Sequence, residues 1–140
     1  MSLDRDTLKL AAVALLDSLA DPHPLGHQES KARRYVLTAP GGTALELMFE
    51  QDPDSRPNLW MLAKAGALSG SYPPHRLFPA ASLRTKRGKD GKLLYGRHSA
   101  LERMPQLGDA DLVCFIPTNL QELGAVLDRA LAASAAGIKP

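Results

Sequence analysis

The sequence predicts an α+β fold: a single domain with a mainly antiparallel sheet, flanked by an N-terminal and a C-terminal amphipathic helix. Three observations predict this class. Apolar residues recur at helical spacing near both ends of the chain, and between the ends they form short alternating or continuous runs typical of strands. The length of 140 residues is the usual size of one domain, so we treat residues 1–140 as one globular unit.

The first predicted element is a helix that begins after Asp4 and ends near Asp21. Asp4 is a suitable N-cap because its side chain can accept a hydrogen bond from a free backbone N–H of the first turn. Pro22 and Pro24 end the helix, since proline lacks an N–H and disfavours helical geometry in the residue before it. Residues 1–3 are set aside as a candidate expression scar. The expected apolar stripe is Leu8, Ala12, Leu15 and Leu19, with Lys9 and Asp17 outside it.

Three strands in series are predicted next, and they form an early three-strand meander. The first run contains Tyr35 and Leu37, and the turn signal of residues 40–42 separates it from the second run. The second run, residues 45–50, alternates apolar and polar side chains, which is typical of a strand with one buried and one solvent-exposed face. The third run is residues 58–62. In the second run we expect Leu45, Leu47 and Phe49 inside, and Glu46, Met48 and Glu50 outside.

The middle of the chain contains a predicted loop, a hairpin and a short helix. Residues 64–79 are rich in Gly, Pro and Ser and show no periodicity, which indicates a long surface loop. Asp90 and Gly91 favour a hairpin turn within the basic stretch that follows. Ser99 with Glu102 three positions later forms a capping box and predicts the start of the short helix. The buried side of this helix is expected to contain Leu101, Met104 and Leu107.

A buried strand and a second long helix complete the predicted fold. Residues 112–116 form a continuous apolar run, which is typical of a strand buried on both faces. Thr118 with Gln121 forms a second capping box and predicts the start of the helix. Residues 133–140 are expected to be a frayed tail. The apolar stripe of the helix is Leu120, Leu123, Leu127 and Leu131.

Composition excludes several classes of protein. The apolar runs are far shorter than the roughly 20 residues of a membrane-spanning helix. Cys114 is the single cysteine and cannot form an intramolecular disulfide, so we expect a reducing compartment and a cytoplasmic protein. No cofactor is expected, because the common phosphate-binding, dinucleotide-binding and nucleophile motifs are missing. No metal site is expected either, because Pro24 and Gly26 interrupt the spacing between His23 and His27.

The most distinctive feature of the sequence is a cluster of positive charge. From Arg84 to Arg97 there are six basic residues and one acidic residue, a net charge of +5 in a chain of net charge +2. A concentrated basic hairpin is typical of a surface that binds phosphate or another anion. The alternative is a solvated hairpin whose charges keep an edge strand from pairing with a neighbour. The candidate anion-binding residues are Arg84, Lys86, Arg87, Lys89, Lys92, Arg97, His98 and Ser99.

Arg97 and His98 are candidates for a more specific anchor within this cluster. They come directly before the helix predicted at Ser99, where free backbone N–H groups and the helix dipole favour a bound anion. The arginine side chain also offers a planar fork of donors that suits phosphate and carboxylate. In the alternative interpretation, Arg97 pairs with a local carboxylate such as Glu102, and His98 is merely exposed or hydrogen-bonded.

Three functions remain open, and the sequence favours the first. It is a non-catalytic binding or interaction module whose partner is anionic, either a nucleic acid or an acidic protein surface. The second is a small hydrolase acting on a phosphate- or carboxylate-bearing substrate, and the third is a domain that forms a homodimer through its last helix or the Pro-Pro segment 72–76. A concave pocket lined by Arg97 and His98, with an acid within hydrogen-bond reach, would favour the hydrolase, whereas a flat or convex face would argue against it. The candidate catalytic residues are His98 as general acid or base, with a carboxylate such as Glu46 or Asp54.

Overall fold

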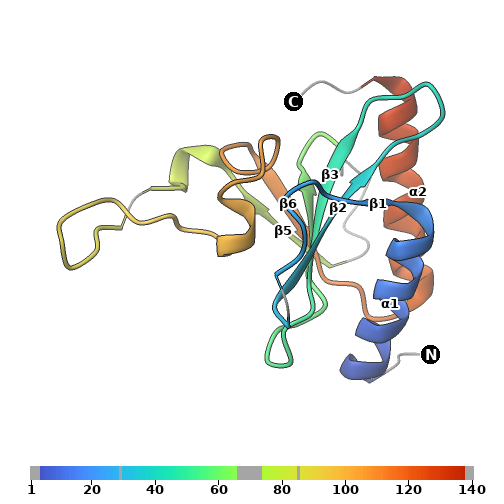
Figure 1. The fold of residues 1–140 in the computed structure, drawn as a ribbon, viewed down its shortest axis with the longest axis horizontal. Helices are drawn as coiled ribbons and strands as arrows, with labels where there is room; N and C mark the ends of the chain where they lie inside the picture. Colours follow the sequence, from blue (N-terminus) through green and yellow to red (C-terminus); the bar gives the residue numbers. More distant parts are fainter. Residues whose placement is uncertain (1–3, 29, 66–73, 85, 138–140) are drawn as a thin grey trace.

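The computed structural model describes residues 4–28, 30–65, 74–84 and 86–137 and confirms the predicted α+β class (Figure 1). Within these residues, a six-stranded antiparallel sheet has the order β1-β2-β3-β4-β6-β5, and β2, β3 and β4 form the predicted meander. None of the described helices is long and apolar enough to cross a membrane. The elements are α1 (Arg5–Leu19), β1 (Asp21–Pro22), β2 (Ala32–Leu37), β3 (Leu45–Glu50), β4 (Leu59–Leu62), β5 (His75–Phe78), η1 (Ala80–Ser82), η2 (Ser99–Leu101), β6 (Leu112–Phe115) and α2 (Leu120–Ala136).

The two long helices cover one face of the sheet (Figure 1). Asp4 caps α1 as predicted, and the candidate scar at residues 1–3 lies outside the described residues. The apolar stripe of α1 differs from the predicted one: Leu16 is fully buried, whereas Leu19 is 44% exposed. Lys9, expected outside the stripe, is buried because its ammonium group donates to the backbone carbonyls of Asp52 and Ser55. The position of the neighbouring elements, rather than the spacing alone, decides which side of the helix is covered.

The second face of the sheet is also covered, and this overturns the prediction of a half-buried strand. All six residues of β3 are buried, including Glu46 and Glu50. The segment of residues 95–108 packs on this face, and its Leu101, Met104 and Leu107 are buried as predicted. A buried carboxylate needs hydrogen-bond donors, and the folded chain supplies them to both glutamates, as described below.

Two segments predicted to be irregular are in fact ordered parts of the fold. The interval 64–79 ends in β5, an edge strand that pairs with β6, while residues 66–73 lie outside the described residues. The strand has only four residues and leaves Leu77 67% exposed, so it has no apolar pattern to predict it. The tail expected at 133–140 is helical up to Ala136, and Gly137 ends α2 with a left-handed φ of 79°.

Both later capping boxes were predicted one residue away from the true cap. The N-cap of α2 is Asn119 instead of Thr118, because the Asn119 side chain accepts the N–H of Glu122 at 2.8 Å. The Glu122 carboxylate in turn accepts the N–H and the hydroxyl of Thr118, each at 2.7 Å. The short helix η2 has only three residues and is capped by His98 instead of Ser99.

The end of α2 is held by a buried serine. The Ser134 hydroxyl accepts the N–H of Ala39 at 2.9 Å and donates to the carbonyl of Thr43. Gly42 allows this approach, because a Cβ atom at that position would lie 2.5 Å from the Ser134 carbonyl oxygen. These bonds join the β2–β3 turn to the last turn of the helix, which explains why the helix does not fray where the sequence suggested it would.

Ser134→Ala is expected to lower the free energy of unfolding by about 1–3 kcal/mol, since the N–H of Ala39 and the carbonyl of Thr43 both lose a partner. Urea unfolding followed by circular dichroism measures this loss. Ser18→Ala is the matched control, because Ser18 is exposed on α1 and its hydroxyl bonds only to the carbonyl of Leu15 among the described residues. Equal losses for the two variants would contradict the proposed role of Ser134.

Candidate functional site

The predicted basic hairpin exists and projects away from the sheet (Figure 1). Gly88 N–H donates to the Lys92 carbonyl at 2.8 Å, and Leu94 N–H donates to the Lys86 carbonyl at 2.8 Å. Gly91 adopts a φ of 80°, the left-handed conformation that glycine favours in such a turn. Asp90 and Gly91 therefore form the turn as the sequence predicted.

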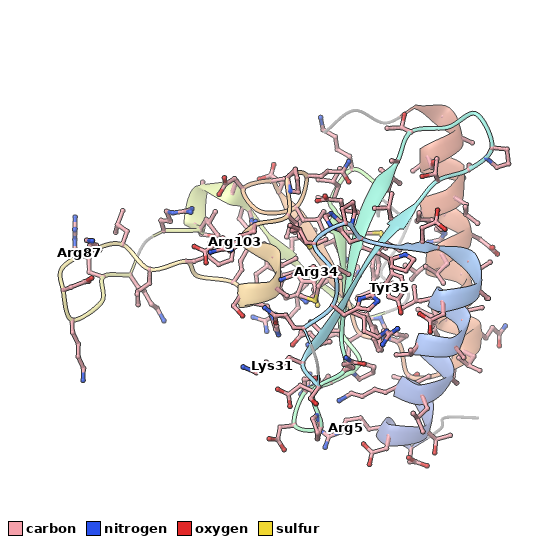
Figure 2. All side chains as sticks on the ribbon, viewed as in Figure 1. Arg5, Lys31, Arg34, Tyr35, Arg87 and Arg103 are labelled. Atoms are coloured by element: carbon pink, nitrogen blue, oxygen red, sulfur yellow. The ribbon has the colours of Figure 1, made fainter. Side chains whose placement is uncertain are left out.

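Four cationic side chains lie on this hairpin, and all are exposed. The ammonium groups of Lys86, Lys89 and Lys92 make no hydrogen bond or ion pair with any residue in the described part of the chain. Arg87, at the far end in Figure 2, donates to the carbonyl of Gly91 at 2.7 Å. With Asp90 as its one acidic residue, the hairpin thus presents a net positive charge to the surroundings.

Arg84 and Arg97, the first and last cations of the cluster, turn back to the body of the protein. Arg84 forms an ion pair with Asp109 at 3.2 Å and lies over the ring of Tyr95 at 5.5 Å. Arg97 donates to the carbonyl of Phe78 at 2.7 Å and, more weakly, to the carbonyls of residues 107 and 108 at 3.4 Å. Arg97 is therefore used to hold the base of the hairpin on β5, and it does not pair with Glu102.

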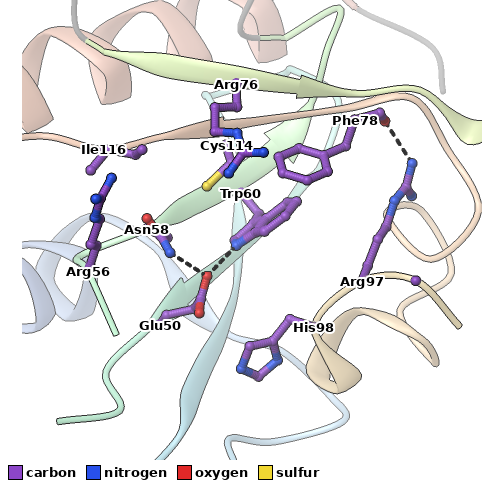
Figure 3. Close-up of a pocket in the computed structure, with 11 residues that line it drawn as sticks. Glu50, Arg56, Asn58, Trp60, Arg76, Phe78, Arg97, His98, Cys114 and Ile116 are labelled. Carbon is purple, nitrogen blue, oxygen red and sulfur yellow. Dashed lines mark hydrogen bonds between the residues drawn. The ribbon is translucent and has the colours of Figure 1, made fainter. Parts of the chain in front are cut away.

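A pocket of about 490 Å³ lies on the sheet face that is turned away from α1 and α2 (Figure 3). Trp60 and Arg76 are both register partners of Cys114, so the three side chains point to the same face of the sheet. Residues 96–98 at the base of the hairpin form the opposite wall. The pocket is therefore built by strands β3 to β6 and by the segment that connects the hairpin to η2.

Glu50 is the acid of this pocket. Its Oε2 atom accepts the side-chain N–H of Asn58 at 2.9 Å and the indole N–H of Trp60 at 2.8 Å (Figure 3). Its Oε1 atom accepts no hydrogen bond from the described residues. One oxygen of the carboxylate is thus fixed by the strands, and the other remains open to a donor on a ligand.

Two further arginines line the pocket, and both lack an acidic partner. The guanidinium groups of Arg56 and Arg76 form no hydrogen bond or ion pair with the described residues. Arg76 lies over the ring of Phe78 at 5.3 Å, which orients it by a cation–π contact. With Arg97, three arginines and one glutamate line the pocket, so its charge favours an anionic ligand.

The hydrogen bond made by His98 decides what its imidazole can do. His98 Nδ1 accepts the N–H of Ala100 at 3.0 Å, so in the neutral ring the proton is on Nε2. An imidazole in this state offers an N–H donor to the pocket and no lone pair at Nε2. His98 is therefore arranged to bind an acceptor rather than to remove a proton as a general base.

Cys114 also faces the pocket but is not arranged as a nucleophile. Burial is the main cause that raises the pKa of its thiol to about 12, and the nearby charge of Glu50 adds to the effect. The reactive form of cysteine is the thiolate, so near neutral pH the side chain is an inert thiol. Cys114 serves as a small wall residue.

The carboxylates predicted as catalytic partners lie elsewhere. Glu46 is buried, and its oxygens accept from His23 at 2.6 Å and from the N–H groups of Gln106 and Leu107 at 2.7 and 3.0 Å. Asp54 is exposed in the turn before β4 and does not line the pocket. The structure thus brings Arg97 and His98 together with Glu50, and not with either predicted acid.

The two histidines considered as metal ligands have partners in the backbone. His23 Nδ1 accepts the N–H of Leu25, and His27 Nδ1 accepts the N–H of Arg34, each at 3.0 Å. Across the described ranges, no cluster of three or more His, Cys, Asp or Glu side chains could hold a metal ion. Both rings therefore contribute hydrogen bonds to the fold.

Sequence reasoning missed Arg56, Arg76 and Trp60, and it took Glu50 for a solvent-exposed residue. In β5, Arg76 and Phe78 lie on one face and Leu77 lies on the other. The sequence would have predicted this shared face only if it had predicted the strand itself. Comparisons of this chain with protein-family models, curated protein sequences and solved structures found no match. Function is therefore inferred from the hairpin and the pocket themselves.

Proposed function

We propose that this domain is a non-catalytic module that binds nucleic acid through its basic hairpin. The observation that carries the proposal is the set of four exposed cations at residues 86–92, three of them without any side-chain partner among the described residues. A surface of this kind attracts phosphates and releases their counterions when they bind. The hairpin also projects from the domain, so it can reach a partner without obstruction by the body (Figure 1).

The alternative role of these charges, protection of an edge strand, has less support. Among the described residues, the hairpin forms one isolated bridge, between Arg87 and Leu93, and it does not belong to the six-stranded sheet. Solvent-exposed charges protect an edge strand from pairing with another chain where a long strand exposes unpaired backbone groups. Here the lysines do not flank such a strand, which supports a partner-binding role.

An acidic protein surface and a second copy of the chain are the other partners considered. An acidic protein offers a similar charge but lacks the regular phosphate spacing, so oligonucleotide binding distinguishes a nucleic acid from an acidic protein as the partner.

A homodimer is the third alternative. Leu123 and Leu127 of α2 are already buried in the core, and Tyr72 and Pro73 of the Pro-Pro segment lie outside the described residues. The mass in solution tests the homodimer, and the cytoplasmic location stays a prediction from the lone cysteine.

A small hydrolase is the second candidate, because one pocket contains Arg97, His98 and an acid, Glu50. Two hydrogen bonds bear on this choice: Arg97 is engaged by carbonyl groups, which favours a structural role for it, and neutral His98 offers a donor at Nε2, which argues against a general base but is compatible with a general acid. General base catalysis needs a lone pair directed at the proton to be removed. Turnover of phosphate or carboxylate esters that is lost in His98→Ala would favour the hydrolase instead.

Replacing the four hairpin cations, Lys86, Arg87, Lys89 and Lys92, by alanine is expected to weaken binding to a single-stranded oligonucleotide by at least about 10-fold at low salt. For each phosphate that the protein no longer neutralises, the slope of the logarithm of the binding constant against the logarithm of the salt concentration falls in magnitude by about 0.7. The loss of four phosphate contacts therefore lowers the magnitude of this slope by up to about 3. Fluorescence anisotropy of a labelled oligonucleotide across a salt series measures both the affinity and the slope.

The matched control removes the same four charges from exposed positions outside the hairpin, namely Arg5, Lys31, Lys64 and Arg103. We expect this variant to retain most of the affinity and slope, because its cations do not share one projecting surface. A wild-type protein that does not bind at low salt, or equal losses in the two variants, would reject the nucleic-acid proposal.

A further inference from the structure

The pocket beside the hairpin has the chemistry of a nucleotide site. We propose that it binds one unpaired guanine nucleotide, with the base edge at Glu50 and His98 and the phosphate near Arg56 and Arg76. This inference rests on the proposed function, because it names what a bound strand would insert at the base of the hairpin. A free guanine nucleotide has the same chemistry and is the second source that the experiment distinguishes.

The hydrogen-bonding groups of the pocket match the Watson–Crick edge of guanine. Glu50 is an acceptor with one oxygen still unpaired among the described residues, and neutral His98 offers an N–H donor from the opposite wall (Figure 3). Guanine presents two adjacent N–H donors next to a carbonyl oxygen, so the open Oε1 atom of Glu50 can accept both N–H groups while the imidazole donates to the carbonyl oxygen. Uracil has one donor between two carbonyl oxygens, so it offers Oε1 a single N–H and brings a carbonyl oxygen towards the carboxylate.

The two arginines account for the phosphate. Arg56 and Arg76 come from the turn before β4 and from β5, and both line the pocket without an acidic partner in the described chain. Guanidinium groups bind phosphate through paired, charge-assisted hydrogen bonds. A ligand with an anionic group is therefore favoured over guanine or guanosine alone.

The size and the aromatic wall also fit a nucleotide. A volume of about 490 Å³ lies within the usual range for small-molecule sites. Trp60 and Phe78 form a tilted pair with ring centroids 4.6 Å apart, and they supply the apolar surface against which a base can pack. The pocket thus combines an acceptor, a donor, an apolar wall and two cations.

Trp60 is the single tryptophan of the chain, so its fluorescence reports occupancy of the pocket directly. We expect guanosine monophosphate to change the emission with saturation, and uridine monophosphate and inorganic phosphate to bind at least 10-fold more weakly. We also expect the pentanucleotide UUGUU to bind at least 10-fold more tightly than UUUUU. The titrations with mononucleotides and with pentanucleotides together distinguish a free nucleotide from a nucleotide within a strand.

Two variants test the assigned roles. Glu50→Gln is expected to remove the preference for guanine, whereas Glu102→Gln, an exposed glutamate outside the pocket, leaves it unchanged. The double variant of Arg56→Ala and Arg76→Ala is expected to lower the affinity for guanosine monophosphate to that for guanosine. These arginines make no hydrogen bond or ion pair with the described residues, and Arg76 only lies over the Phe78 ring, so we expect this variant to keep its fold even if Glu50→Gln does not.

The outcomes separate this inference from the proposed function. Oligonucleotide binding through the hairpin without any guanine preference or Trp60 response overturns the pocket assignment alone. A Trp60 response to the free nucleotide without oligonucleotide binding supports the pocket and overturns the nucleic-acid module. A response to inorganic phosphate as strong as that to guanosine monophosphate overturns the role of the base edge.

Discussion

Glu46→Ala is expected to lower the free energy of unfolding by about 3–5 kcal/mol, the loss typical of breaking a buried ionisable pair. Glu46 is 8% exposed, and its carboxylate accepts from the ring of His23 and from two backbone N–H groups, at residues 106 and 107. Removing it leaves three buried or partly buried donors without this partner. Because these donors join β3 to the 95–108 segment and to the chain after α1, the loss affects several parts of the fold.

Urea unfolding at neutral pH measures this loss, and two further variants keep the test decisive. Glu46→Gln is expected to retain part of the stability, because its single amide oxygen can serve the two backbone N–H groups or His23, but not both. Glu102→Gln, on the exposed surface, is expected to change the free energy of unfolding by less than about 0.5 kcal/mol. A loss below about 1 kcal/mol for Glu46→Ala would contradict the assignment.

Arg34→Met is expected to cost about 2–3 kcal/mol, because Arg34 ties η2 and the loop after β1 to β2. Its guanidinium donates to the carbonyl of Ala100 at 2.9 Å and to those of Leu25 and Gly26 at 3.4 and 3.3 Å. Burial lowers the pKa of Arg34, so the fold already bears a desolvation cost that methionine would relieve. The three carbonyls left without this donor make the net effect destabilising.

Amide hydrogen exchange provides a second measurement for Arg34→Met. Residues 98–101 are expected to lose protection more than β3 does, since the bond to Ala100 holds this segment on the sheet. Arg5→Met is the control, because Arg5 is exposed on α1, away from this segment (Figure 2), and its guanidinium makes no hydrogen bond or ion pair with the described residues. Uniform exchange changes, or equal losses for Arg5→Met, would show that Arg34 does not hold the segment.

Much of the fold could be predicted from short stretches of the sequence. The N-cap Asp4, the turn at residues 40–42, the strand 112–115 and the hairpin at Asp90 all lie at or near their predicted positions. Each of these is signalled by residues that are close in the chain. Local patterns therefore predicted these elements and the α+β class correctly.

The predictions failed where the partner comes from a distant part of the chain. The alternation in β3 indicated a solvent-exposed face, yet Glu46 meets Gln106 and Glu50 meets Trp60. β5 was missed because a four-residue edge strand is held by β6 rather than by its own apolar pattern. The cap of η2 was misplaced because a histidine side chain, not the serine, accepts the backbone N–H.

The candidate site shows the same division. The sequence indicated the cluster of positive charge and included Arg97 and His98, but it could not show that Arg97 is occupied by the carbonyl of Phe78. It also could not show that Arg56 and Arg76, twenty positions apart, line one pocket with Glu50. Those relations depend on the pairing of β4, β5 and β6.

By itself, the sequence determined the class of fold, the positions of most elements and the existence of a basic hairpin, because these follow from periodicity, turn residues and local charge. Only the tertiary structure decided which face of the sheet is covered and which charged groups remain without a partner among the described residues. The physical reason is that burial and hydrogen bonding depend on what lies nearby in space. Arg34 and Ala100, 66 residues apart, meet only once the sheet has formed.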